Sequence, residues 1–128
     1  MASGNLKGEE CVVIKLQAGG VVTVGDVVHY ESDGYFDMVT TADMGKFGVA
    51  LDAAAAEGDW IRVCVWGRAE VKATAAAIKK GAYVIAGTTG FVVDAGTISE
   101  TTVYGTIVGT AMTAFDSSGQ GTIFVGLM

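Results

Sequence analysis

The seven residues from 60 to 66 read Trp60-Ile61-Arg62-Val63-Cys64-Val65-Trp66. Successive side chains of a β-strand point to opposite faces of the sheet, and this stretch alternates in the same way. It therefore predicts a strand that turns Ile61, Val63 and Val65 to one face and Trp60, Arg62, Cys64 and Trp66 to the other. We expect the first face in the core and the second only partly in solvent.

Similar short runs, rich in β-branched and aromatic residues and separated by Gly or Asp turns, lie on both sides of this strand. They are Cys11–Leu16, Val21–Val24, Val27–Tyr30, Tyr35–Val39, Tyr83–Ala86, Phe91–Val93, Val103–Val108 and Thr122–Leu127. The Ala-rich segment Leu51–Glu57 ends before Gly58 and predicts one or two short helical turns. The segment Arg68–Lys80 predicts a strand to about Ala73 and then a turn.

Two parts of the chain resemble each other. Gly48-Val49-Ala50-Leu51-Asp52-Ala53 followed by Gly58 recurs as Gly109-Thr110-Ala111-Met112-Thr113-Ala114 followed by Gly119. After a one-residue slip Ile61, Val63 and Val65 match Ile123, Val125 and Leu127, and the related runs Val22–Val28 and Ile78–Val84 precede the two copies. Duplication and chance similarity in an Ala- and Gly-rich chain both fit this pattern.

The fold expected from these runs is mainly β. Halves of this size cannot cover their own apolar faces, so we expect a small barrel or sandwich of two similar halves with one or two short helical turns. Residues 1–10 have too little apolar content to offset the entropy of ordering, which predicts a flexible N-terminal arm. Residues 11–128 are predicted to form a single β-barrel-like domain.

Charge limits the functions that the chain can have. The net charge of −6 disfavours direct nucleic-acid binding, because proteins that grip phosphates are usually basic. The longest uncharged stretch, Thr101–Phe115, is too short to span a membrane, so no membrane partner is expected. From Gly81 onward the charged residues are Asp94, Glu100 and Asp116 alone. This charge-poor third predicts an interface, and the alternative is a neutral surface that needs no partner.

The sequence offers little catalytic chemistry. The one histidine, His29, lies within a predicted strand, and no Gly-x-Ser-x-Gly motif, phosphate-binding loop or zinc-ligand spacing occurs. Cys11 and Cys64 could form one disulfide, but each lies in an apolar run where a buried free thiol is the preferred interpretation. The acidic stretch around Asp33 and Asp37 predicts a solvated hairpin rather than a calcium loop. We therefore expect no enzyme and no cofactor or metal, with an acid-catalysed hydrolase at Asp33 and Asp37 as a remote alternative.

The tryptophans of the strand predicted at residues 60–66 have three possible interpretations. Trp60 and Trp66, on one predicted face with Arg62, could form a core pair, protein-interface anchors or a platform for stacking sugars. The last of these makes the second candidate function a β-barrel module that binds a ligand such as a carbohydrate through an exposed Trp.

Four segments carry a resemblance to a known family: Gly48–Gly67, Ile78–Val84, Gly109–Met112 and Gly121–Leu127. In their order and spacing they resemble the small capsid decoration, or cement, proteins of tailed bacteriophages. The resemblance implies a virion structural protein, made in the host cytoplasm, that sits on the outer surface of an icosahedral head. There it would bridge neighbouring major capsid proteins and stabilise the expanded capsid, as a homotrimer. The family brings no catalytic residues.

Candidate contact residues follow from the resemblance together with the charge map. The N-terminal arm Met1–Glu10 would latch onto the shell, and the charge-poor third would meet the capsid or other copies. The candidates for capsid contact or the oligomer interface are Asn5, Leu6, Lys7, Trp60, Arg62, Trp66, Tyr104 and Ile107.

Overall fold

The computed structural model describes residues 11–39, 46–73, 78–87, 90–94, 107–115 and 119–126. The regular elements in these ranges are all strands, which confirms the mainly β class. They are β1 (Cys11–Gln17), β2 (Val27–Tyr30), β3 (Phe36–Met38), β4 (Phe47–Ala50), β5 (Trp60–Lys72), β6 (Tyr83–Ala86), β7 (Val92–Asp94), β8 (Ile107–Ala111) and β9 (Gln120–Val125). Among the described residues, no helix has the length and apolar character needed to cross a membrane.

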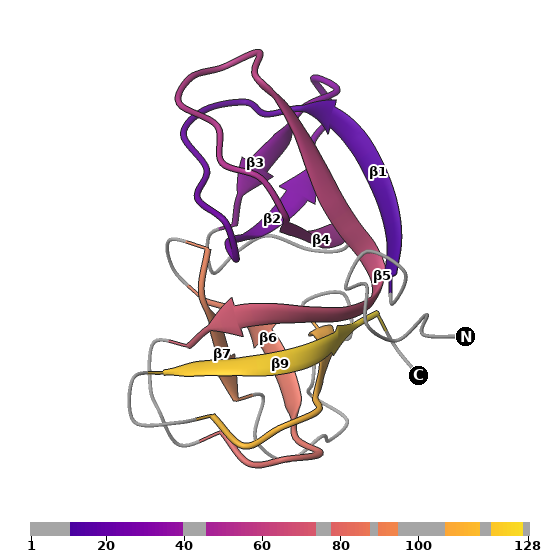
Figure 1. Ribbon diagram of the computed structural model, residues 1–128, viewed down its shortest axis with the longest axis vertical. Helices are drawn as coiled ribbons and strands as arrows, with labels where there is room; N and C mark the ends of the chain where they lie inside the picture. The colour runs from indigo at the N-terminus through magenta and orange to yellow at the C-terminus, as the bar shows by residue number, and fades with distance from the viewer. Residues whose placement is uncertain are drawn as a thin grey trace, which may run out of the picture.

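The nine strands form one antiparallel sheet that curls twice (Figure 1). The hydrogen-bonded order is β3-β2-β4-β5-β9-β8-β6-β7, and β1 pairs with β5 outside this path. We call β1–β4 with residues 60–65 of β5 the N-terminal half-barrel. Residues 66–72 of β5 with β6–β9 form the C-terminal half-barrel. In Figure 1 the N-terminal half-barrel lies above the other, and β5 runs through both.

The two half-barrels share one topology. Each has five strand segments in the same order, and β1 pairs with the first part of β5 as the second part of β5 pairs with β9. An isolated parallel bridge ties the two ends of each curl together. Equivalent contacts in the two halves are Leu16–Ile61 with Val71–Gly121, and Ala18–Phe36 with Ala73–Val92. The predicted division into two similar halves is therefore confirmed.

The repeated turns also correspond in detail. Gly25 and Gly81 have φ values of 91° and 90°, a left-handed conformation that glycine adopts readily. Each donates its N–H to the carbonyl of the equivalent alanine, Ala50 at 2.9 Å and Ala111 at 2.8 Å.

The sheet register corrects one detail of the predicted repeat. Val63 lies opposite Ala50, and Ile123 lies opposite Ala111. Val63 is therefore the equivalent of Ile123, whereas the sequence comparison paired Ile123 with Ile61. The error arises because the connection before the last strand differs in length between the copies, and only the sheet register shows where the strands realign.

β5 serves both halves by burying a different face in each. Its first part buries Ile61 and Val63 in the core of the N-terminal half-barrel. Its second part buries Ala69 and Val71 in a larger core that fills the C-terminal half-barrel and extends to the outer face of the N-terminal one. The two halves are thus joined through a continuous apolar contact as well as through one strand.

A bulge at Val65 produces this change of face. Val12 lies opposite Trp66, and the pairing of β1 with β5 then skips Val65, which is the extra residue of a β-bulge. Trp60 lies opposite Gln17, whose side chain points away from that of Val12 because side chains alternate along β1. The prediction that Trp60 and Trp66 share a face is therefore wrong.

Local expectations agree with the structure to different degrees. The strand predicted to about Ala73 is confirmed, since β5 runs to Lys72, whereas β4 was not expected. The helical turns expected over residues 51–57 are absent, because Ala54 forms a bridge with Val22 instead. The Asp59 carboxylate then accepts the N–H groups of residues 55 and 56 at 2.9 and 3.2 Å. Sheet pairing thus outweighs the helix propensity of alanine here.

Candidate interaction surfaces

An apolar groove lies at the open end of the N-terminal half-barrel. It has a volume of about 370 Å³, and its lining residues are Ile14, Leu16, Tyr30, Phe36, Lys46, Phe47 and Val65. The rings of Tyr30 and Phe36 meet edge to face with centroids 5.6 Å apart. Seven residues from five strand regions converge here because the sheet curls, which brings β1 and β3 close together although they are far apart in the strand order.

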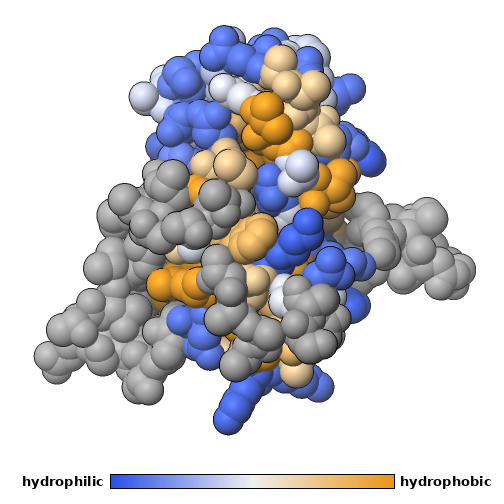
Figure 2. All heavy atoms as spheres, turned by 90° about the vertical axis from the view of Figure 1, so that its left-hand side faces the viewer, coloured by the Kyte–Doolittle hydropathy of each residue, from blue (hydrophilic) through white to orange (hydrophobic). Residues whose placement is uncertain are grey.

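The edge strand β1 adds exposed apolar side chains next to this groove. Among the described residues β1 pairs only with β5, and Val12, Val13 and Ile14 are all exposed. Exposed apolar edge strands are templates for pairing or packing with another chain. Figure 2 views the molecule from the left-hand side of Figure 1, away from β1, and shows that apolar side chains reach the surface among hydrophilic ones on that face too.

Trp66 lies beside this strand and is packed into a defined position. Its ring meets Phe124 edge to face, with centroids 5.0 Å apart, and about half of the residue remains exposed. Gly126 lies beneath the indole, where a Cβ atom would stand 2.6 Å from a ring carbon. Trp66 is therefore held in one position while about half exposed, and exposed tryptophans are frequent at the centre of protein interfaces.

The other two contact candidates in β5, Trp60 and Arg62, have different surroundings. Trp60 is exposed at the start of β5. Arg62 is also exposed, but its guanidinium binds Asp52, with Nε 3.0 Å from Oδ2 and Nη2 2.9 Å from Oδ1. This hydrogen bond lowers the pKa of the Asp52 carboxyl and raises the pKa of the Arg62 guanidinium. Arg62 thus holds the turn after β4 against β5, in addition to facing solvent.

The remaining predicted contact residues are not part of the exposed surface formed by the groove, β1 and Trp66 in the described part of the chain. Ile107 is only 6% exposed, so it is a core residue in this conformation. Asn5, Leu6, Lys7 and Tyr104 lie outside the described residues. The sequence analysis missed Ile14, Tyr30, Phe47 and Phe124, although the unbroken apolar run at residues 12–14 signals an apolar side chain on both faces of β1.

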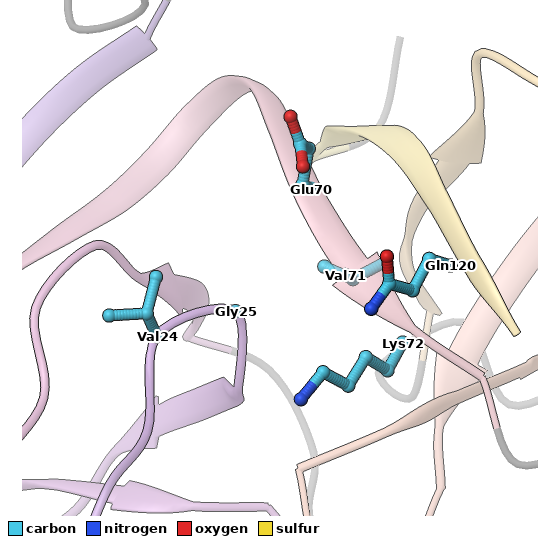
Figure 3. A pocket seen from close by; sticks show the side chains of 6 residues that line it. All are labelled: Val24, Gly25, Glu70, Val71, Lys72 and Gln120. Carbon is cyan, nitrogen blue, oxygen red and sulfur yellow. The ribbon is translucent and has the colours of Figure 1, made fainter. Parts of the chain in front are cut away.

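A smaller and more polar hollow lies between the two half-barrels (Figure 3). It has a volume of about 150 Å³ and is lined by Val24, Gly25, Glu70, Val71, Lys72 and Gln120. Lys72 and Gln120 extend toward the turn at Val24 and Gly25, while Glu70 points away from that turn. The amine of Lys72 and the carboxylate of Glu70 therefore point in different directions and do not converge on one point of the hollow.

The acidic hairpin gathers three carboxylates. Oxygen atoms of Glu31, Asp33 and Asp37 lie within 4.8 Å of one another. His29 Nε2 is 3.2 Å from a Glu31 oxygen, and Asp33 accepts the N–H of Tyr35 at 3.0 Å. Calcium sites use six to eight oxygen ligands, so three carboxylates supply only part of one. The cluster fits the predicted solvated hairpin.

The two cysteines are free thiols in different surroundings. Cys11 is partly exposed and Cys64 is buried. Burial, together with the neighbouring Cys11, raises the pKa of the Cys64 thiol to about 12. Since the thiolate is the reactive form, Cys64 is chemically inert at neutral pH.

Comparison with known proteins identifies a family and a solved structure that are similar to this chain. The phage cement protein family matches residues 6–127. Among solved structures, the base of the head fiber gp8.5 of bacteriophage phi29 is similar in fold, with a TM-score of 0.62 and 19% sequence identity. The similarity covers 90% of this chain and 93% of that one. A comparison with curated proteins finds no match. Because the family matches nearly the whole length of this chain, the chain belongs to the phage cement proteins, which are structural components of the virion associated with the capsid.

Proposed function

We propose that the protein decorates the outer surface of an icosahedral phage head and bridges neighbouring major capsid proteins. The observation that carries this proposal is the family match over residues 6–127. The exposed apolar surface of the N-terminal half-barrel supports it, because a protein that works by binding needs such a surface and no catalytic machinery. The protein acts as a binding component and not as an enzyme.

Stabilisation of the shell follows from preferential binding. A protein that binds the expanded shell, and not the unexpanded one, shifts the equilibrium toward the expanded state. Each contact can be modest, because linked contacts multiply: bivalent attachment raises overall affinity by about 10²–10⁴-fold. We propose a homotrimer for this reason, with residues 1–10 as the arm that adds a further contact to each major capsid protein.

Trp60 is the proposed anchor on the capsid side. It is exposed, it lies at the start of β5 on the other face from Trp66, and large aromatic side chains are frequent hot spots in interfaces. Loss of a hot spot costs about 2 kcal/mol or more, which corresponds to roughly a 30-fold loss of affinity.

The test uses purified heads of the cognate phage that lack the protein, in expanded and unexpanded forms. We expect saturable, stoichiometric binding to expanded heads only, with higher resistance of the bound heads to heat. Trp60→Ala should bind roughly 30-fold more weakly, and Val21→Ala, which also truncates an exposed apolar side chain, should bind as the unmodified protein does.

Two results would contradict the proposal. Absence of binding to expanded heads would exclude capsid decoration as the function. Equal binding to both forms would exclude stabilisation by preferential binding. Binding to a glycan that is lost in Trp60→Ala, with no binding to heads, would favour the ligand-binding alternative.

A further inference from the structure

Within one molecule, the outer face of the N-terminal half-barrel packs against the C-terminal half-barrel. On the outer face of the N-terminal half-barrel, Val27, Val49 and Cys64 form a row across three neighbouring strands, with Val27 opposite Val49 and Val49 opposite Cys64. All three are fully buried, and they belong to the same apolar core as the interior of the C-terminal half-barrel. We call this set the inner row.

The inner row meets the open end of the C-terminal half-barrel. That end is lined by Ala69, Val71, Ala86 and Val92, which are buried in the same core as the inner row. The topology makes these four residues the equivalents of four groove residues of the N-terminal half-barrel. In the same order, the equivalents are Ile14, Leu16, Tyr30 and Phe36.

The open end is therefore covered in one half-barrel and uncovered in the other. Ile14 is 40% exposed and Tyr30 is 38% exposed, whereas their equivalents Ala69 and Ala86 are buried. The N-terminal half-barrel has nothing in the described part of the chain that occupies the position held by the inner row in the C-terminal one. The groove therefore corresponds to the end that the inner row covers in the C-terminal half-barrel, but no described residue covers it.

The molecule also carries an unused counterpart of the inner row. On the outer face of the C-terminal half-barrel, Tyr83 lies opposite Thr110, and Thr110 lies opposite Phe124. These residues are the equivalents of Val27, Val49 and Cys64 and form what we call the outer row. Tyr83 is 39% exposed, and Phe124 and Thr110 are only partly buried.

We infer that the outer row of one copy of this chain seats in the groove of a second copy. The contact repeats between molecules the arrangement that the inner row makes within one molecule. Both surfaces are aromatic, with Tyr30 and Phe36 in the groove and Tyr83 and Phe124 in the outer row. Aromatic side chains bury large areas at low entropic cost, which suits them to an interface that no covalent strand supports.

The association is head to tail. Because the groove and the outer row are different surfaces, each copy that joins leaves one groove and one outer row free until the assembly closes. Such heterologous contacts build closed rings or open chains. The inference concerns contacts between copies and does not depend on capsid binding.

The test measures the mass of the full chain in solution by sedimentation. The unmodified protein should exceed the 13.1 kDa of one chain, with the mass rising with concentration. Ile14→Asp in the groove and Tyr83→Asp in the outer row should each reduce the mass to that of one chain. Val21→Asp, on an exposed apolar residue outside both surfaces, should assemble normally. If Ile14→Asp does not fold by circular dichroism, Tyr30→Ser replaces it.

Mixing the two monomeric variants separates head-to-tail contact from other modes. Each variant keeps one intact surface, so an equal mixture should form a dimer of one copy of each and nothing larger. A monomeric unmodified protein, assembly by either variant alone, or a mixture that stays monomeric would overturn the inference.

A shortened chain identifies a competing occupant of the groove. If residues 1–10 of the same chain fill the groove, the unmodified protein is monomeric and deletion of these residues releases self-association, which also overturns the inference. Failure to bind heads with self-association intact would count against the proposed capsid binding alone. Binding to heads without self-association would count against this inference and against the proposed homotrimer, and would leave capsid binding standing.

Discussion

Exchanging one pair of core residues tests whether the two half-barrels are equivalent in packing as well as in topology. In the C-terminal half-barrel, the buried ring of Phe115 lies directly over Gly121. In the N-terminal half-barrel, the equivalent positions hold Ala54 and Ile61, so the large side chain comes from the opposite partner. The double change Phe115→Ala with Gly121→Ile gives the C-terminal half-barrel the packing of the N-terminal one.

The two single changes should each be costly. Phe115→Ala removes a buried ring and should lower the free energy of unfolding by about 3–5 kcal/mol. A Cβ atom at position 121 would lie 2.6 Å from Cε1 of Phe115, so Gly121→Ile alone overpacks the site and should cost about 1–3 kcal/mol or more.

The double change should be cheaper than the ring deletion alone. It removes about six carbon atoms and restores about four, so the net loss is near two methylene groups, or about 1.6 kcal/mol at roughly 0.8 kcal/mol each. Urea unfolding followed by tryptophan fluorescence gives the free energies of all four proteins, and the cycle gives the coupling between the sites. A double variant as unstable as the sum of the two single ones would refute the equivalence. The reverse exchange, Ala54→Phe with Ile61→Gly, serves as a matched control in the other half.

Two further predictions concern titratable groups. At pH 8 the folded protein should react with a thiol reagent at Cys11 only, and Cys64 should react more than a thousandfold more slowly than an ordinary thiol until the protein is unfolded, because its pKa is about 12; rapid labelling of both in the folded state would contradict this environment. The pKa of Asp52 is lowered in the folded state, so its pairing with the guanidinium stabilises the fold above the ordinary value of 3.8 and is lost as the pH falls through the lower, folded value. The small decrease in Tm caused by Asp52→Asn should therefore be present at pH 7 and disappear in acid, and a decrease that grows in acid would contradict the assignment.

Much of the fold was predictable because its signals are local. Strands β2 and β6 lie where short runs rich in β-branched and aromatic residues predict them, and turn glycines mark the repeated corners. The segment at residues 51–57 was not predictable in the same way, since its alanines favour a helix in isolation and only the partner at Val22 commits them to a bridge. Strand β4, which follows residues 40–45, gave too short an apolar run to identify.

The candidate surfaces depend on longer-range geometry. The exposure of Trp60 agrees with its proposed role as an anchor, but its separation from Trp66 onto the other face requires the bulge at Val65, which is visible only in the register of β1 on β5. Likewise, residue type favours burial of Ile107 over Tyr83, but only the packing shows that Ile107 is a core residue and Tyr83 a surface residue.

The sequence by itself determined the mainly β class, the position of most strands and the charge-poor C-terminal third, and it pointed to a two-part repeat, because residue type, turn residues and composition are local properties. Only the tertiary structure decided which copy of the repeated open end is covered. The two half-barrels have equivalent strands, but β5 joins them in one direction, so the outer face of the first fills the open end of the second. That asymmetry leaves the groove at Ile14 and Tyr30 and the row at Tyr83 uncovered, and it arises from the packing of distant segments rather than from any local pattern.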